Sequence, residues 1–145
     1  MEYQGPLTKV GLKCINTPGL GEKLAPLYGI SSAIVIPPNA TLFETSGHTG
    51  CNLDIEYPES LKDEILQAFQ NVENTLIAAG VPGGWQGVYK MTSYHVGSLD
   101  DAGEGLEAAM AKYLKDNRIA WCGVSVAGLS GPARIEITVS AAKGP

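Results

Sequence analysis

The sequence carries few charges and no long hydrophobic segment. Only 17% of its 145 residues are charged, the formal net charge is −5, and lysine and arginine form no cluster. Proteins that bind nucleic acid need a basic surface to contact phosphates. A membrane-spanning helix needs roughly 18 or more consecutive apolar residues, and no such run is present. We therefore expect neither nucleic acid nor a membrane as a partner.

Cysteine and histidine are scarce as well. Cys14, Cys51 and Cys122 lie far apart without a C-x-x-C pair, so we expect free thiols. The two histidines, His48 and His95, have no third potential ligand at a helical spacing, which argues against a catalytic zinc. We expect no metal and no cofactor. No basic region followed by an apolar stretch begins the chain, so a secretory signal is not predicted and a cytoplasmic location is expected.

The short motifs of several enzyme classes are also missing. The glycines within residues 18–23 lack the spacing and the final Ser/Thr of a phosphate-binding loop. Gly83 and Gly84 precede a predicted strand, whereas a dinucleotide-binding motif opens a helix. No G-x-S-x-G nucleophile elbow occurs. Nucleotide-binding enzymes and α/β-hydrolases are therefore not indicated.

Two segments have the apolar periodicity of amphipathic helices. In residues 60–79, apolar side chains recur every three or four positions, at Leu61, Ile65, Phe69, Val72 and Leu76. Ser60 can cap the start of this helix and Gly80 its end. The second helix begins at residue 100 or 101 and ends near residue 115. Acidic residues at its start and lysines near its end favour the helix dipole.

Strands are predicted where β-branched and aromatic residues gather. These segments are 7–13, 32–36, 42–46, 87–96, 120–127 and 134–141. The order β-β-β-α-β-α-β-β predicts one α/β domain over residues 1–145, with a mixed sheet and both helices on one face. We expect association between copies to cover the other face. His95, inside a predicted strand, is more typical of a hydrogen-bonded structural imidazole than of a general base.

Four segments resemble the motifs of one known family. The sequence T-S-G-H-T-G at 45–50 is similar to its T-S-G-Q-x-G segment, and residues 71–80 match its N-x-x-x-x-L-x-A-A-G helix. V-Y-K-M-T at 88–92 matches its V-x-K-x-T strand. V-S-V-A-G-L, which leads to I-E-I at 135–137, is similar to its V-x-V-x-x-L segment and E-I-E strand. The chain thus resembles the Rid (YjgF-like) family of reactive-intermediate deaminases over about residues 28 to 141.

The resemblance implies a fold, an assembly and a chemistry. The fold is a chorismate-mutase-like (YjgF-like) α/β fold, and the assembly is a homotrimer with small-molecule clefts between neighbouring subunits. Active members of the family hydrolyse reactive imines and enamines without a cofactor, releasing ammonia and a keto acid. In them, an arginine clamps the substrate carboxylate, while backbone N–H groups and a glutamate position the attacking water.

The chain departs from the family at the arginine. Counting back from Glu136, which matches the family's glutamate, the arginine position holds Trp121, and the nearest arginine is Arg118. An indole cannot clamp a carboxylate, so we expect the pocket to prefer a neutral, aromatic or apolar ligand. Two alternatives remain open: Trp121 could pack in the core or a subunit interface, and Glu136 could be merely solvated. Cys122 is a further candidate for the pocket, either inert or reactive.

The remaining candidate pocket residues also follow from the resemblance. Ser46 and Gly47 match the segment that lines the family's cleft. The family's pocket tyrosine corresponds to Ile30 or, with a small shift, to Tyr28. His48 stands in place of the usual glutamine.

Three functional hypotheses follow. The first is an enzyme that adds water to, or moves a proton on, a small imine, enamine or related unsaturated intermediate, in specialised metabolism. Its acid/base would be Glu136, with backbone donors near Gly47. The second is a non-catalytic homotrimer that binds or shields an apolar metabolite. The third is RNA cleavage, an activity sometimes assigned to this family, which the acidic composition disfavours.

Overall fold

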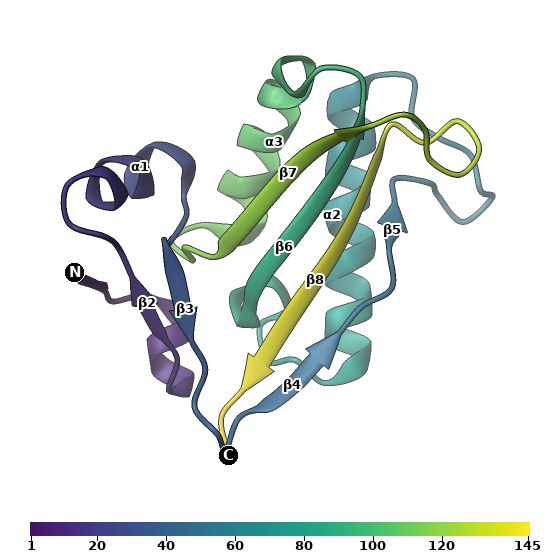
Figure 1. The fold of residues 1–145 in the computed structure, drawn as a ribbon. Coiled ribbons are helices and arrows are strands. Elements are labelled where there is room, and N and C mark those ends of the chain that lie inside the picture. The colour runs from purple at the N-terminus through teal and green to yellow at the C-terminus, as the bar shows by residue number, and fades with distance from the viewer.

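The chain forms two sheets and one layer of helices (Figure 1), and the computed structural model describes all residues 1–145. The elements in chain order are β1 (Glu2–Tyr3), the 3-10 helix η1 (Pro6–Val10), β2 (Lys13–Ile15), α1 (Leu20–Tyr28), β3 (Ala33–Val35), β4 (Thr41–Glu44), β5 (His48–Thr49), α2 (Leu61–Ala79), the 3-10 helix η2 (Gly84–Gly87), β6 (Val88–Val96), the 3-10 helix η3 (Leu99–Ala102), α3 (Gly103–Ala109), the π-helical turn η4 (Met110–Leu114), β7 (Ala120–Val126) and β8 (Ile135–Lys143).

The larger sheet has five strands. Its order is β4-β8-β6-β7, and β5 also pairs with β8. β6 and β7 are parallel and are connected through α3, whereas the other pairs are antiparallel. Helices α2 and α3 lie across one face of this sheet, and no helix of the chain covers the opposite face (Figure 1). The predicted fold class, a mixed sheet with two long helices on one face, is therefore confirmed.

Helix α2 begins and ends where its sequence predicts. The Ser60 hydroxyl accepts a hydrogen bond from the backbone N–H of Asp63 at 3.0 Å, which satisfies one of the free donors of the first turn. Gly80, at a φ of 95°, ends the helix in the left-handed conformation. The side chains of α2 that face the sheet are fully or almost fully buried: Ile65, Phe69, Val72 and Leu76. Burial of each such side chain stabilises the fold by about 1.5–3 kcal/mol.

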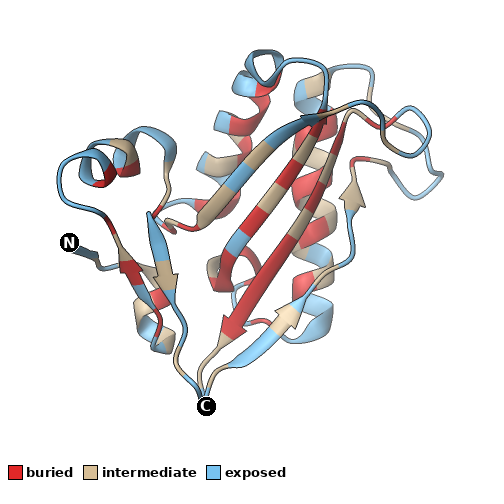
Figure 2. Ribbon diagram, in the orientation of Figure 1, coloured by how far each residue is buried: buried red, intermediate tan, exposed pale blue.

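The main core lies between the helices and the sheet. Figure 2 shows buried residues along β6, β8 and the inward side of α2, while β7 is largely intermediate or exposed. Ile135, Ile137 and Val139 of β8 belong to this core. Trp85 stacks on Phe69 with ring centroids 4.6 Å apart and donates its indole N–H to the Phe69 carbonyl at 2.9 Å. No helix combines the length and the apolar content that crossing a bilayer would require.

The N-terminal segment differs from the prediction. Strands β1, β2 and β3 form a separate three-stranded sheet instead of joining the main one. The predicted strand 7–13 is wrong except at its last residue, because Pro6–Val10 is a 3-10 helix and the strand begins at Lys13. Pro6 suits a first helical turn, the Thr8 hydroxyl donates to the Gly5 carbonyl at 2.7 Å, and Gly11 at a φ of 92° ends the helix.

Helix α1 was not predicted from the sequence. Its glycines and Pro26 are typical of a loop, yet the Thr17 hydroxyl accepts from the Gly21 N–H at 3.1 Å and Gly29 ends the helix at a φ of 65°. The second predicted helix exists but is divided. A 3-10 helix (η3) precedes α3, and a π-helical turn (η4) follows it.

The ion pair between Glu64 and Arg134 provides a test of the fold. Glu64 is 0% exposed and accepts from the Arg134 Nε and backbone N–H groups, each at 2.7 Å. Glu64→Ala removes the carboxylate that accepts both hydrogen bonds from Arg134. We therefore expect the free energy of unfolding in urea to fall by about 3 kcal/mol. Lys62→Ala, which breaks only an exposed pair with Glu104, is the control and should cost less than about 0.5 kcal/mol. Equal effects of the two substitutions would contradict this assignment.

Candidate functional site

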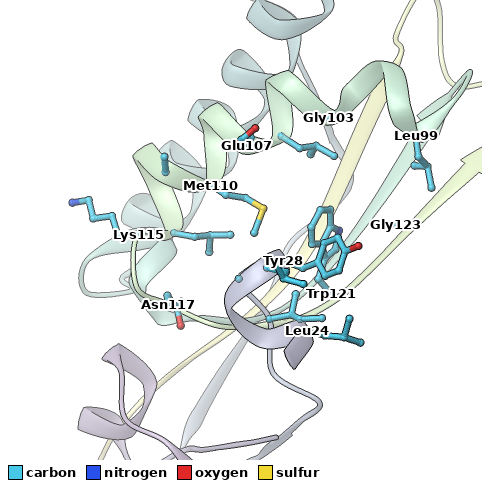
Figure 3. A pocket seen from close by; sticks show the side chains of 16 residues that line it. Leu24, Tyr28, Leu99, Gly103, Glu107, Met110, Lys115, Asn117, Trp121 and Gly123 are labelled. Atoms are coloured by element: carbon cyan, nitrogen blue, oxygen red, sulfur yellow. The ribbon is translucent and has the colours of Figure 1, made fainter. Parts of the chain in front are cut away.

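A pocket lies between α1, the outer strand β7, and α3 with η4 (Figure 3). Its volume is about 810 Å³, and ten of its 16 lining residues are hydrophobic. The two charged side chains among them, Glu107 and Lys115, are both exposed. This is the composition of a pocket for a small, largely apolar molecule.

Two aromatic side chains characterise the pocket. Tyr28 comes from the end of α1 and Trp121 from β7, and both line the cavity (Figure 3). Ile30, the other candidate for the tyrosine position, lines it as well and forms a parallel bridge with Ile119. Tyr28 is 55% exposed, so its ring is available to a ligand.

The side chain of Met110, which directly follows α3, lies close to Gly29 at the end of α1. A Cβ added at Gly29 would lie 2.9 Å from the Met110 Cε, so only glycine allows this close approach without a shift. Met110 also lines the pocket, and its flexible thioether can adapt to ligands of different shape. Sequence reasoning did not identify Met110, Leu24 or Leu27 as pocket residues, because the helix that brings two of them there was not predicted.

The indole N–H of Trp121 is already used inside the protein. It donates to the Ser93 hydroxyl at 3.0 Å, so the ring offers a ligand its aromatic face and not a donor. Trp121 also packs against the main core. Of the alternatives considered for this residue, the structure shows both core packing and pocket lining.

A second group of candidate residues lies away from this pocket. Ser46 and Gly47 precede β5, which pairs with β8 so that Thr49 is opposite Glu136. A Cβ added at Gly47 would overlap the Glu136 carboxylate. The absence of a side chain at Gly47 thus lets the carboxylate lie against the backbone of this segment.

His48 ties the same segment to α2. Its Nδ1 lies 2.8 Å from the Ser46 carbonyl oxygen, and its Nε2 lies 2.8 Å from the Thr75 hydroxyl. Because Thr75 is on α2, the imidazole fixes the Ser46–Gly47 turn to the helical layer. His48 is not among the residues that line the pocket.

Cys122 lies on the open face of the sheet. Alternate residues of a strand point to opposite faces, so Cys122 points away from the side on which Trp121 lies. It is exposed and is paired in register with Thr92 of β6. Within one chain, Cys122 is therefore not part of the pocket.

The predicted site residues thus form two half-sites that lie toward opposite edges of the sheet. The β7 half-site contains Tyr28, Ile30 and Trp121, and the β8 half-site contains Ser46, Gly47 and Glu136. The strand order places β7 at one edge, whereas β5 and β4 flank β8 on its other side. A single copy does not bring the carboxylate to the aromatic pocket.

Comparisons with known proteins identify the fold and the family. The family model described as Endoribonuclease L-PSP matches residues 22–143. YyfB from Yersinia pestis, described as a protein of unknown function of the conserved Rid family, has a similar structure with a TM-score of 0.77 at 21% identity, over 90% of this chain and 97% of that chain. A putative endoribonuclease from Thermotoga maritima gives 0.65 at 22% identity, over 91% and 93%.

A third similar structure was solved with a ligand. It is E. coli TdcF with bound serine, with a TM-score of 0.63 at 20% identity, over 79% of this chain and 94% of that chain. At such identities, these three structures establish the fold alone. No curated protein matches the sequence at a significant level.

His95 makes the stability of the fold depend on pH in a way that can be tested. Burial lowers the pKa of its imidazole below the ordinary value of 6.5. As the pH falls below 6.5, His95 is protonated in the unfolded chain but stays neutral in the folded chain, so the free energy of unfolding decreases. Well above pH 6.5, His95 is neutral in both states and does not make the free energy of unfolding depend on pH.

His95→Gln should therefore lose less stability than the natural chain between pH 7.5 and pH 5.5, two values that bracket the unfolded-state pKa of about 6.5. Urea denaturation at several pH values measures the difference. Parallel curves for the two proteins would show that His95 is not buried in its neutral form.

Proposed function

This chain belongs to the Rid, or YjgF-like, family, and on that premise we propose that it is a homotrimeric, cofactor-independent enzyme that acts on a small imine or enamine in a cleft shared between copies. The observation that carries the proposal is the separation of the two half-sites toward opposite edges of one sheet. Each half-site lacks what the other supplies: one has an apolar pocket, and the other has a carboxylate beside backbone donors.

A ring of copies would join the half-sites. When two different surfaces of identical chains meet head to tail, the contact repeats and closes if the rotation allows. The β8 half-site of one copy would then complete the β7 half-site of its neighbour. The open face of the sheet supports this arrangement, because exposed apolar side chains such as Val124 and Leu42 lie on the strands that would be covered.

In such a cleft, Glu136 would act as the acid/base. It would take a proton from water while the oxygen bonds to the C=N carbon, and it would return that proton to the nitrogen. Glu136 would then move the hydroxyl proton of the resulting carbinolamine to its nitrogen, so that the carbon–nitrogen bond breaks and ammonia leaves as the C=O bond forms. Backbone N–H groups near Gly47 would stabilise the charge that develops.

The pocket also limits the class of substrate. Trp121 provides an aromatic face, its N–H is occupied by Ser93, and no arginine lines the cavity. A carboxylate has no partner there that resembles a bidentate guanidinium. We therefore propose a neutral aromatic or apolar imine as the substrate, in specialised metabolism, and a cytoplasmic protein of one domain.

A non-catalytic role is the second candidate. It is favoured by the same loss of the arginine, together with the distance between Glu136 and the pocket within one chain. In that case the trimer would bind an apolar metabolite without changing it. RNA cleavage is not supported, because the chain has a net charge of −5 and no basic cluster.

Ammonia release from two imines tests the proposal. The natural chain should accelerate hydrolysis of benzophenone imine, which is neutral and aromatic, more than that of freshly generated 2-aminoacrylate. Glu136→Gln should lower kcat by about 10²- to 10⁴-fold, the usual contribution of a general acid/base. Trp121→Arg should shift the preference toward 2-aminoacrylate.

Glu44→Gln is the matched control, since Glu44 is an exposed carboxylate that faces the same strand β8 through Ser140. Its activity should equal that of the natural chain. Full activity of Glu136→Gln would remove Glu136 from the mechanism. Binding of either compound without turnover would instead support the non-catalytic role.

A further inference from the structure

Beneath the pocket, three polar side chains form one chain of hydrogen bonds. The Trp121 Nε1 donates to the Ser93 hydroxyl at 3.0 Å, and the same hydroxyl lies 2.8 Å from the His95 Nε2. Ser93 is 0% exposed and His95 is 2% exposed. These hydrogen bonds therefore lead from the wall of the pocket into the layer between the sheet and the helices.

The backbone makes room for this arrangement at one position. Gly123 is opposite Ser93 in the parallel pair β6–β7. A Cβ at Gly123 would lie 3.1 Å from the Ser93 Oγ and 3.6 Å from the Trp121 Nε1. The missing side chain lets the indole lie along β7 over Ser93, and Gly123 itself lines the pocket.

One nitrogen of this arrangement has no partner. An indole can only donate, so the Ser93 oxygen accepts from Trp121, and the Ser93 hydroxyl shares a second hydrogen bond with the His95 Nε2 whose direction depends on the imidazole tautomer. In either tautomer, the His95 Nδ1 is buried and has no hydrogen-bond partner. An unsatisfied buried polar group is costly to the fold.

These two polar side chains lie among apolar ones on the same face of the sheet. Ser93 and His95 are in register with Ile137 and Ile135 of β8, and Met91 is two residues before Ser93 on β6. A pair of apolar side chains would fill this position without leaving an unpaired nitrogen. The polar pair is therefore better explained by what it does to Trp121 than by what it does for the core.

We propose that Ser93 and His95 are positioning residues, which hold the Trp121 indole flat against the pocket so that it presents its aromatic face to a ligand. Ser93 binds the ring directly, and His95 orients the Ser93 hydroxyl. The proposal rests on the proposed role of the pocket in binding a neutral aromatic molecule. It adds two specificity-determining residues that do not touch the ligand.

The first readout is the Trp121 ring itself. In ¹⁵N-labelled protein, the two indole N–H signals are assigned with Trp121→Phe. Ser93→Ala should shift the Trp121 signal and speed its exchange with water, while the Trp85 signal stays in place because its N–H bonds the Phe69 carbonyl. Ser125→Ala is the control, since its hydroxyl binds the Gly97 carbonyl instead.

The second readout compares binding with stability. The probe is N-phenyl-1-naphthylamine, a neutral aromatic fluorophore, with Trp121→Ala as the reference for loss of the pocket wall. Ser93→Ala should weaken probe binding by about 3- to 10-fold, the value of one hydrogen bond. His95→Val should weaken it similarly while the urea midpoint is unchanged or raised, because an unpaired nitrogen is removed.

The outcomes separate the two proposals. If Trp121→Ala does not change probe affinity, the binding role of the pocket fails. If Trp121→Ala weakens binding but the Ser93 and His95 variants leave both affinity and the indole signal unchanged, only the positioning role fails. Loss of stability in step with loss of affinity in both variants would also overturn it, since it would show a purely structural role.

Discussion

The register of β6 between β7 and β8 determines to which face of the sheet Trp121, Cys122 and Glu136 point. β6 pairs in parallel with β7 and antiparallel with β8, which places Met91 beside Trp121 on one side and beside Val139 on the other. This face carries the helices, the core and the pocket. A shift of one residue between β6 and β7 would turn Trp121 to the open face and bring Cys122 into the pocket instead. Such a shift would also remove Trp121 from the core and break its hydrogen bond to Ser93.

The same register explains how the chain can keep one half of a family site while changing the other. The β8 half-site depends on Gly47 and Glu136, whose close contact requires only β5 and β8. The β7 half-site depends on α1, on Trp121 and on the layer beneath it. Because the two half-sites share no contact within a chain, the aromatic wall can replace a charged clamp without disturbing the carboxylate. Under the proposed function, the chemistry and the specificity of the cleft would therefore be separable.

Much of the fold could be predicted from local patterns. Helix α2 has both caps and a clear apolar stripe, and β8 alternates between buried and outward residues, so short-range rules were sufficient for both. They failed at α1, where glycine and proline suggested a loop, and at η1, where a strand was predicted. In both helices, hydrogen bonds of a threonine side chain, Thr17 and Thr8, stabilise the first turn. The pocket wall formed by α1 was therefore missed. The hydrogen bond between Trp121 and Ser93 could not be predicted either, since it joins residues 28 positions apart and depends on strand register.

The central claim is that one working site takes Trp121 from one copy and Glu136 from the next. The most direct test mixes two poorly active variants, Trp121→Ala and Glu136→Gln, by joint refolding, and follows hydrolysis of benzophenone imine. Light scattering should give three times the chain mass of 15.2 kDa. In a ring with shared sites, an equal mixture should recover about a quarter of the natural activity, because a quarter of the sites combine both intact halves. Mixed trimers that recover no activity, or a monomeric mass, would contradict the account.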